Sequence, residues 1–208
     1  MRNVRLLVLL VALMLVPASL SAQGVPFMDG GIGFFGGVAL PTGDFADDDG
    51  EDAGGAETGF MVGADAYLPL GSTAFGWVTS ASINSFGVDD DGNDEVDLGR
   101  YWLLPIMTGV SYPIVLSPTM SISPMAQIGL NIAFGPNGEI ADEDFNTSTS
   151  FSLAFSAGAN MMFSETLGAT LRYVNGGAPE REIEQGELEG ERDNPMSFLQ
   201  LGVLWRFR

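Results

Sequence analysis

The acidic side chains are the groups in this sequence with the clearest capacity for chemistry. The 208-residue chain carries 27 Asp and Glu residues and eight basic residues, all of them Arg, and it contains no Lys, His or Cys. Without His the commonest general base near neutral pH is missing, and without Lys a Ser–Lys catalytic pair is impossible. Without Cys there are no disulfides and no thiolate metal sites. We therefore expect neither an enzyme nor a resident cofactor, and the formal net charge of −19 argues against nucleic acid as a partner.

The acidic runs could bind a cation. The run "DDDGNDEVD" (89–97) spaces its carboxylates around a glycine as Ca²⁺ loops do, and "DDDGED" (47–52) is similar. Neither run matches the full EF-hand pattern, which requires a Glu at its twelfth position and flanking helices. A solvated, self-repelling charge run explains the same composition and is the interpretation we favour, with Ca²⁺ binding as the alternative. The candidate ligands of that alternative are Asp89, Asp91, Asp94 and Asp97.

Three further charged residues, Asp65, Arg172 and Arg206, lie in segments that are otherwise apolar or small, so their role depends on the elements around them. From Phe151 to Phe163 every second residue is apolar, and most residues between them are small or polar. This period of two indicates a strand whose faces meet different environments. The alternation recurs in the segments 60–68, 120–134, 167–174 and 197–207, and more loosely in 32–40 and 75–86. The segment 100–112 is apolar on both faces, so the sequence does not orient it.

These patterns predict an all-β fold with eight antiparallel strands and little helix. The expected strands are 31–40, 58–70, 74–87, 100–114, 119–134, 149–163, 166–175 and 195–207. Short turns near residues 72, 117 and 164 alternate with four long segments, which hold 24 of the 27 acidic residues. Short turns at one end and long polar loops at the other are typical of an up-and-down transmembrane β-barrel, with the turns in the periplasm and the acidic loops outside the cell.

The choice of inner face decides between a membrane barrel and a soluble β-protein, which is the alternative. The interior of an eight-stranded barrel is just wide enough for side chains to fill. We therefore expect small residues such as Ser152 and Ser156 inside, and bulky ones such as Phe151 and Leu153 outside against acyl chains. Aromatic residues gather near both strand ends, as interfacial girdles do. The expected girdles are Phe75, Trp77, Phe163, Trp205 and Phe207 towards the short turns, and Phe60, Phe86, Phe134, Phe151 and Tyr173 towards the long loops.

Asp65, Arg172 and Arg206 then fall on inner faces, with Arg206 near the short-turn end. An Arg facing lipid at the bilayer midplane costs about 2–4 kcal/mol, so an inward direction is favoured. An unpaired buried carboxylate is also costly. We expect Asp65 to join an interior ion pair or hydrogen-bond network, with Arg172 or Arg100 as its partner. Such a pair could be a gate or a proton path, but we favour a structural plug because so narrow a barrel is filled.

The N-terminal segment has the features of a secretory signal peptide. Arg2 and Arg5 precede an apolar run of eleven residues (6–16), and small residues lead to a cleavage position expected between Ala22 and Gln23. A membrane anchor is the alternative, but this run is short against the roughly 20 residues that span a bilayer. The expected organisation is a cleaved signal peptide (1–22), a short N-terminal segment (23–30) and a barrel domain (31–208).

The opening "GIGFFGGVALPTGDF" is similar to the first strand and loop of the small OmpA-like and OmpX-like outer-membrane β-barrel domains of Gram-negative bacteria. The closing "FLQLGVLWRFR" resembles the C-terminal strand that the barrel-assembly machinery reads, with Trp205 and Phe207 as its aromatic residues. The family usually ends on the aromatic residue, whereas Arg208 follows here. The resemblance implies an outer-membrane location, a monomer, and membrane lipids and lipopolysaccharide as partners beside the assembly machinery.

Two functions remain open at this point. The first is a structural or surface-interaction scaffold, in which the barrel is an anchor and the acidic loops are the exposed surface. The second is a small transport barrel or narrow channel for ions or apolar molecules. We favour the scaffold, because side chains should fill a barrel of this size.

Overall fold

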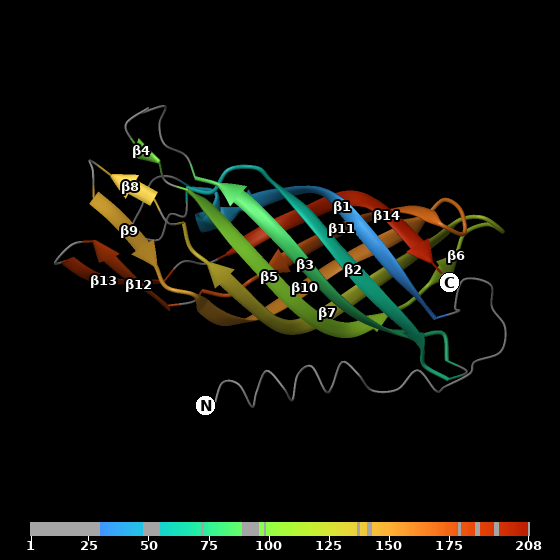
Figure 1. Ribbon diagram of the computed structural model, residues 1–208. Coiled ribbons are helices and arrows are strands. Elements are labelled where there is room, and N and C mark those ends of the chain that lie inside the picture. Colours follow the sequence, from blue (N-terminus) through green and yellow to red (C-terminus); the bar gives the residue numbers. More distant parts are fainter. Residues whose placement is uncertain are drawn as a thin grey trace.

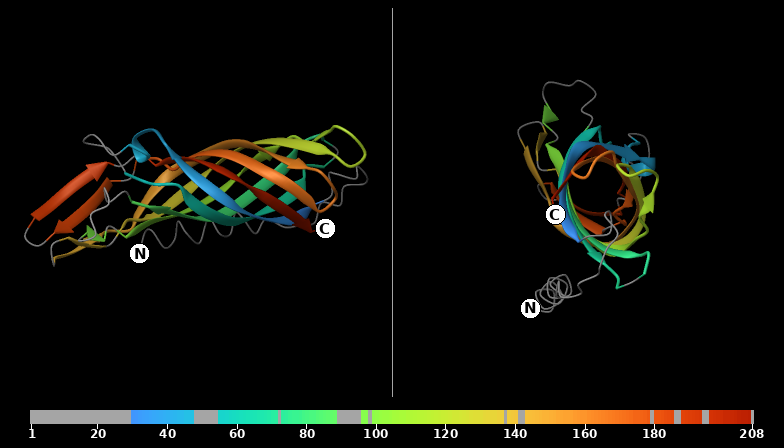
Figure 2. Two further views of the ribbon diagram at one scale, coloured as in Figure 1. Left: turned by 90° about the horizontal axis from the view of Figure 1, so that it is seen from above. Right: turned by 90° about the vertical axis from the view of Figure 1, so that its right-hand side faces the viewer.

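A computed structural model describes residues 30–47, 55–71, 73–88, 96–97, 99–136, 138–140, 143–178, 180–185, 188–193 and 196–207. Eight long antiparallel strands form one closed barrel (Figures 1 and 2). They are β1 Gly31–Thr42, β2 Gly59–Pro69, β3 Gly76–Gly87, β5 Arg100–Ser111, β7 Ser121–Phe134, β10 Ser150–Met162, β11 Leu167–Asn175 and β14 Ser197–Phe207. The predicted fold is confirmed. The largest difference at a strand end is three residues, where β5 stops at Ser111 and the sequence predicted 114.

The pairing register defines the shear of the barrel, which is the residue offset after one circuit of the strands. Strand β14 pairs with both β11 and β1, and β10 pairs with both β7 and β11, so every long strand has two neighbours. Following the paired residues once around the barrel from Ile32 leads to Thr42, an offset of 42 − 32 = 10 residues. For eight strands this offset corresponds to a strand tilt of roughly 40°.

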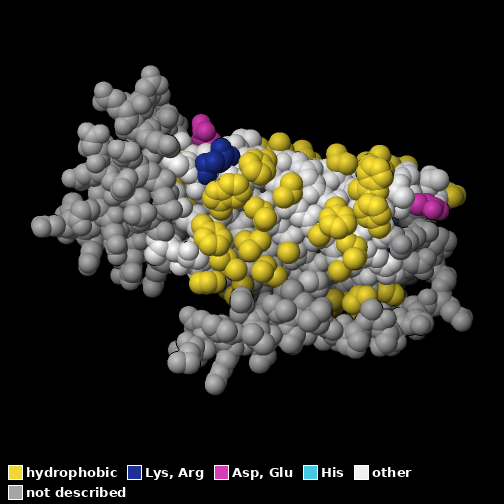
Figure 3. All heavy atoms as spheres, in the orientation of Figure 1, with side chains coloured by type: hydrophobic (Ala, Val, Ile, Leu, Met, Phe, Trp, Pro, Cys, Tyr) yellow, Lys and Arg dark blue, Asp and Glu magenta, His cyan; other side chains and the backbone are white. Residues whose placement is uncertain are grey.

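The barrel has its bulky apolar side chains outside, as predicted. Phe151, Leu153 and Phe155 are 58%, 64% and 52% exposed, whereas Ala154 between them and Ser156 after them are buried. Figure 3 shows hydrophobic side chains spread over the face of the wall seen in that view. The structure also orients β5: Leu103 and Met107 are buried inside, and Trp102 is exposed on the outer wall.

The end where the connections 70–75, 112–120 and 163–166 join the strands is called the turn end, and the opposite end the loop end. Exposed aromatic residues lie at both ends, and nine of the ten predicted girdle residues are among the exposed ones. Phe86 is the exception, and its assignment to the outer girdle is wrong. It lies on the inner face of β3 together with Asn84 and is fully buried.

The loop end carries a second sheet that the sequence did not predict. Its strands are β4 Val96–Asp97, β8 Gly138–Ile140, β9 Glu143–Thr147, β12 Glu180–Gln185 and β13 Leu188–Asp193. They pair in the order β13-β12-β9-β8-β4, and Figure 1 shows them beyond the barrel. The other short elements are β6 Ile114–Val115, which pairs with β7, and the 3₁₀ turn η1 Gly43–Phe45. Within the described ranges, no helix has the length and apolar character needed to cross a membrane.

Candidate functional site: the barrel interior

The centre of the barrel holds a buried ion pair between Asp65 of β2 and Arg172 of β11. The guanidinium donates two hydrogen bonds to the carboxylate, from Nη1 to Oδ1 at 2.9 Å and from Nη2 to Oδ2 at 2.5 Å. Both residues are only 1% exposed. A bidentate geometry of this kind is the strongest form of a charge-assisted hydrogen bond and offsets part of the cost of burying two charges.

Other side chains complete the coordination of this pair. Asp65 Oδ2 also accepts hydrogen bonds from the Tyr67 hydroxyl at 2.8 Å and from Asn160 Nδ2 at 3.2 Å. Arg172 donates from Nε to Thr170 Oγ1 at 3.0 Å and from Nη2 to Asn160 Oδ1 at 3.2 Å. The Arg172 guanidinium also lies over the Phe35 ring, 4.4 Å from its centroid, which adds a cation–π contact.

Glycines on the inner wall leave the space that this arrangement needs. A Cβ added to Gly158 would lie 2.7 Å from the Arg172 Cα, and one added to Gly63 would lie 2.4 Å from Phe35 Cζ. Real Cβ atoms do not approach other atoms so closely, so a larger residue at either position would displace the pair or its aromatic neighbour. The small inner residues that the alternation singled out therefore make room for a few large ones.

A neutral polar network crosses the lumen beside the ion pair. Gln127 Nε2 donates to Ser80 Oγ at 2.9 Å, and Ser156 Oγ donates to Gln127 Oε1 at 3.2 Å. Towards the loop end, Gln200 Nε2 donates to Ser82 Oγ at 3.0 Å and to Asn84 Oδ1 at 2.7 Å. These side chains come from four different strands, β3, β7, β10 and β14, and are buried, so they fill the cross-section with mutually satisfied polar groups.

At the loop end the interior changes from polar to aromatic. Phe45 of η1 packs against Phe86 and Tyr101, with ring centroids 5.1 and 5.3 Å apart, and Phe86 packs against Phe198 at 5.3 Å. All four residues are buried. The buried position of Phe45 could not be predicted from the sequence, because this residue lies in an acid-rich loop segment and is buried through η1.

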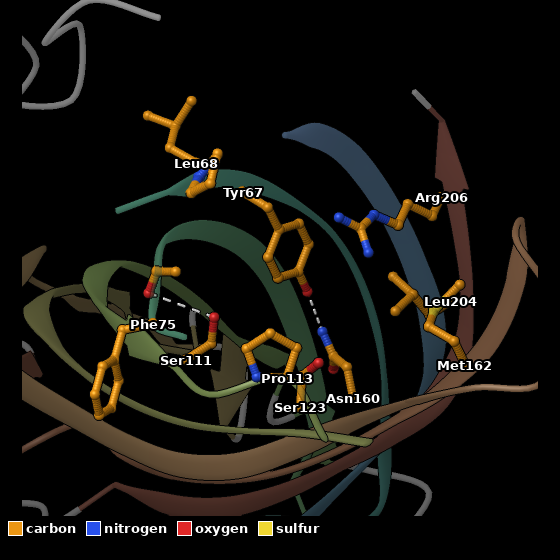
Figure 4. Close-up of a pocket in the computed structure, with 12 residues that line it drawn as sticks. Tyr67, Leu68, Phe75, Ser111, Pro113, Ser123, Asn160, Met162, Leu204 and Arg206 are labelled. Carbon is orange, nitrogen blue, oxygen red and sulfur yellow. Dashed lines mark hydrogen bonds between the residues drawn. The ribbon is translucent and has the colours of Figure 1, made fainter. Parts of the chain in front are cut away.

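A small pocket that is partly open to solvent lies at the turn end. Figure 4 shows Tyr67, Asn160 and Arg206 pointing into it from three strands, with Leu204, Met162 and Pro113 as apolar lining. The Arg206 guanidinium lies over the Tyr67 ring, 4.9 Å from its centroid. Tyr67 and Asn160, which also bond to Asp65, form the contact between this pocket and the ion pair.

The predicted site residues have different outcomes. The structure pairs Asp65 with Arg172 and places Arg206 on the inner face near the turn end. The suggestion of Arg100 as a partner of Asp65 is wrong, because Arg100 shares the outer face of β5 with Trp102 and is exposed. Trp205 and Phe207 are exposed at the end of β14, with their rings stacked at 6.2 Å.

The proposed Ca²⁺ ligands cannot be placed as a group. Asp89, Asp91 and Asp94 lie outside the described residues. Only the backbone of Asp97 is described, and it pairs with the backbone of Glu139 where β4 runs beside β8. Among the described residues no cluster of three or more carboxylates could hold a metal ion. Residues 1–29, which include the predicted signal peptide, also lie outside the described part of the chain.

A closed barrel of eight antiparallel strands, apolar outside and small or polar inside, defines the class of transmembrane β-barrels. Residues 8–207 match the sequence profile of the family described as outer membrane protein beta-barrel domain, so the chain belongs to that family and is located in the outer membrane. The predicted family resemblance is thereby confirmed. No curated protein sequence shows significant similarity to the chain.

Solved structures with the same architecture have little sequence in common with this chain. The outer membrane protein OprG from Pseudomonas aeruginosa aligns with a TM-score of 0.55 at 16% identity, over 90% of this chain and all (100%) of OprG. Ail, the attachment invasion locus protein of Yersinia pestis, aligns with a TM-score of 0.49 at 13% identity, over 86% of this chain and 97% of Ail. Likeness at this level of identity concerns the fold alone.

Proposed function

We propose that this protein is a non-conducting, non-catalytic scaffold of the outer membrane, in which the barrel anchors the acidic loops at the cell surface. The observation that carries the proposal is the filled interior. Moving from the turn end to the loop end, a solute would meet the Asp65–Arg172 pair, the Gln127 and Gln200 networks and then the aromatic cluster of Phe45 and Phe86. An ordered array of satisfied side chains resists opening, because each member would lose its partners.

The loop end supports the surface role. Four acid-rich segments lie between the long strands, and parts of three of them pair into the five-stranded sheet described above. A sheet holds exposed backbone in a defined shape, which a recognition surface requires. With so acidic a composition, its partner would be a basic protein surface or a cation-bridged anionic one.

Liposome swelling tests the closed interior directly. Vesicles that contain the folded barrel should swell in small sugars no faster than protein-free vesicles, and planar bilayers should show no discrete current steps. Heat-modifiable migration on a gel confirms that the inserted protein is folded. Swelling or steady channel activity by the unmodified protein would refute the scaffold proposal.

The second candidate is a narrow transport barrel, and the pocket at the turn end is the observation that favours it. A solute could enter that pocket and would then need the Asp65–Arg172 pair to separate. The two candidates differ in the effect of breaking this pair. If the pair is a gate, a variant with both charges removed, D65L/R172M, should conduct, whereas a filled scaffold should remain closed.

A further inference from the structure

Arg100 lies on the outer wall at the loop end, in a setting that its predicted role did not anticipate. Phe60 of β2, Ser85 of β3 and Trp102 of β5 are direct register partners across three adjacent strands. Arg100 comes two residues before Trp102 on the same face, and its Nε donates to Ser85 Oγ at 2.8 Å. The guanidinium carbon is 5.8 Å from the centroid of the Phe60 ring, and the rings of Phe60 and Trp102 meet edge to face at 5.9 Å.

This cluster holds the cation in one orientation, and the described part of the chain provides partners for few of its donors. Arg100, Phe60 and Trp102 are exposed, while Ser85 beneath them is fully buried. Among the described residues, Ser85 Oγ is the one acceptor of a hydrogen bond from Arg100, and no described carboxylate is within ion-pair distance of it. The Glu57 carboxylate lies beside Gly87, the register partner of Arg100, without forming an ion pair with it.

The surroundings of the cluster are those of a membrane interface. Val62 and Ile83, exposed on the same wall, continue the apolar surface towards the centre of the barrel. Aromatic residues at strand ends occupy the headgroup level, where a charged side chain costs only about 0–1 kcal/mol instead of the larger cost at the midplane. The groups available to a guanidinium at that depth are lipid phosphates, and the planar fork of Arg binds phosphate in a bidentate manner.

We propose that Arg100, held by Ser85, Phe60 and Trp102, binds the phosphate of an anionic lipid in the leaflet at the loop end. The guanidinium nitrogens Nη1 and Nη2 contact the phosphate, and the two aromatic rings contact the upper part of the acyl chains. The strongly acidic chain does not attract anionic lipids in general. Among the described Arg side chains, Arg100 is the one that lies on the outer wall at the loop end, so the proposed binding depends on it. The site is independent of whether the barrel conducts.

Tryptophan fluorescence can report on this site alone. The chain has three Trp residues, and Trp77 and Trp205 lie at the turn end, so the variant W77F/W205F leaves Trp102 as the single fluorophore. This barrel is reconstituted into phosphatidylcholine vesicles that contain a minor fraction of lipid with brominated acyl chains, either phosphatidylglycerol or phosphatidylcholine. Bromine quenches only nearby fluorophores, so the ratio of the two quenching efficiencies measures local enrichment of the anionic lipid.

We expect brominated phosphatidylglycerol to be preferred near Trp102 by about fivefold, the effect of one basic residue at a membrane surface. R100Q should abolish this preference, and E57Q should increase it by removing a nearby negative charge. Trp77 alone, in W102F/W205F, serves as the matched control at the opposite end and should show no dependence on R100Q. Unbrominated lipid A should compete for the site, whereas inorganic phosphate at the same concentration should not.

Equal quenching by the two brominated lipids in W77F/W205F with Arg100 intact would overturn the proposal, and so would a preference that survives R100Q. Displacement of the lipid by inorganic phosphate would also overturn it, because the site would then recognise a free anion. Gel mobility with and without heating establishes that each variant is folded, which an exposed outer-wall substitution should not disturb.

Discussion

Removing one partner of the central ion pair should be far more damaging than removing both. In D65A the guanidinium of Arg172 stays buried and loses the two hydrogen bonds of 2.9 and 2.5 Å, while Tyr67 and Asn160 lose their bonds to the carboxylate. Breaking a buried pair in this way costs about 3–5 kcal/mol, since an uncompensated charge remains inside. Replacing both residues by apolar ones of similar size, as in D65L/R172M, should be nearly neutral or should stabilise the barrel by about 1–4 kcal/mol.

Reversible urea unfolding in lipid vesicles, followed by Trp fluorescence, gives the free energies of unfolding for this comparison. The single variants D65L and R172M and the double variant D65L/R172M form a double-mutant cycle, and its coupling energy isolates the pair, while D65A is measured beside them. A loss below about 1 kcal/mol in D65A would refute the reasoning, because it would mean that water or another group neutralises Arg172. A double variant as unstable as D65A would refute it equally, since the harm would then come from packing and not from charge.

Three further outcomes are expected. G63A should destabilise the barrel by about 1–3 kcal/mol in the same urea assay, because its Cβ would lie 2.4 Å from Phe35 Cζ. G36A should be nearly neutral, because no atom would lie closer than 3.6 Å to its Cβ. Equal losses of stability in the two variants would contradict the packing argument. F86A should lower the free energy of unfolding by about 3–5 kcal/mol, because it opens a cavity in the aromatic cluster. F134A, at an exposed position, should lower it by less. A larger loss in F134A than in F86A would contradict the buried position of Phe86. Isothermal titration with millimolar Ca²⁺ should give no saturable heat of binding, because we interpret the acidic runs as solvated charge. A stoichiometric binding curve would instead establish a metal site, with the candidate ligands Asp89, Asp91, Asp94 and Asp97.

The strands and their orientation could be predicted because the period of two is local and strong. Phe151, Leu153 and Phe155 alternate without interruption with the small residues Ser152, Ala154 and Ser156, and one face had to meet lipid. The opposite signs of Asp65 and Arg172 on inner faces then suggested the pair that the structure contains.

Where a strand lacks this contrast, the prediction failed. The segment from Arg100 onwards is apolar on both faces, so nothing in it indicated that Arg100 shares the outer face of Trp102. In β3 the inner face reads Ser80, Ser82 and Asn84, and Phe86 interrupts that polar series at its end. An aromatic residue near a strand end is typical of a girdle, but here the interior changes from polar to aromatic at the same level.

The five-stranded sheet at the loop end could not be predicted from local sequence patterns, for a different reason. Strand β4 pairs with β8, and β9 pairs with β12, so its partners come from three separate loops. Their sequences are rich in acidic residues and have no alternation of apolar and polar residues. Pairing of this kind depends on the barrel holding the loops close together, and the chain carries no short-range signal for it.

The position of the Asp65–Arg172 pair has a consequence for how the cylinder is assembled. Its strands, β2 and β11, flank β1 and β14, the first and last strands, and the contact between those two is the seam of the barrel. The two charges therefore belong to opposite edges of the unclosed sheet and cannot meet until the N-terminal and C-terminal edges have joined. Closure of the seam therefore allows the ion pair to form and neutralises both charges at once. In a sheet that has not closed, the two charges remain apart and unpaired.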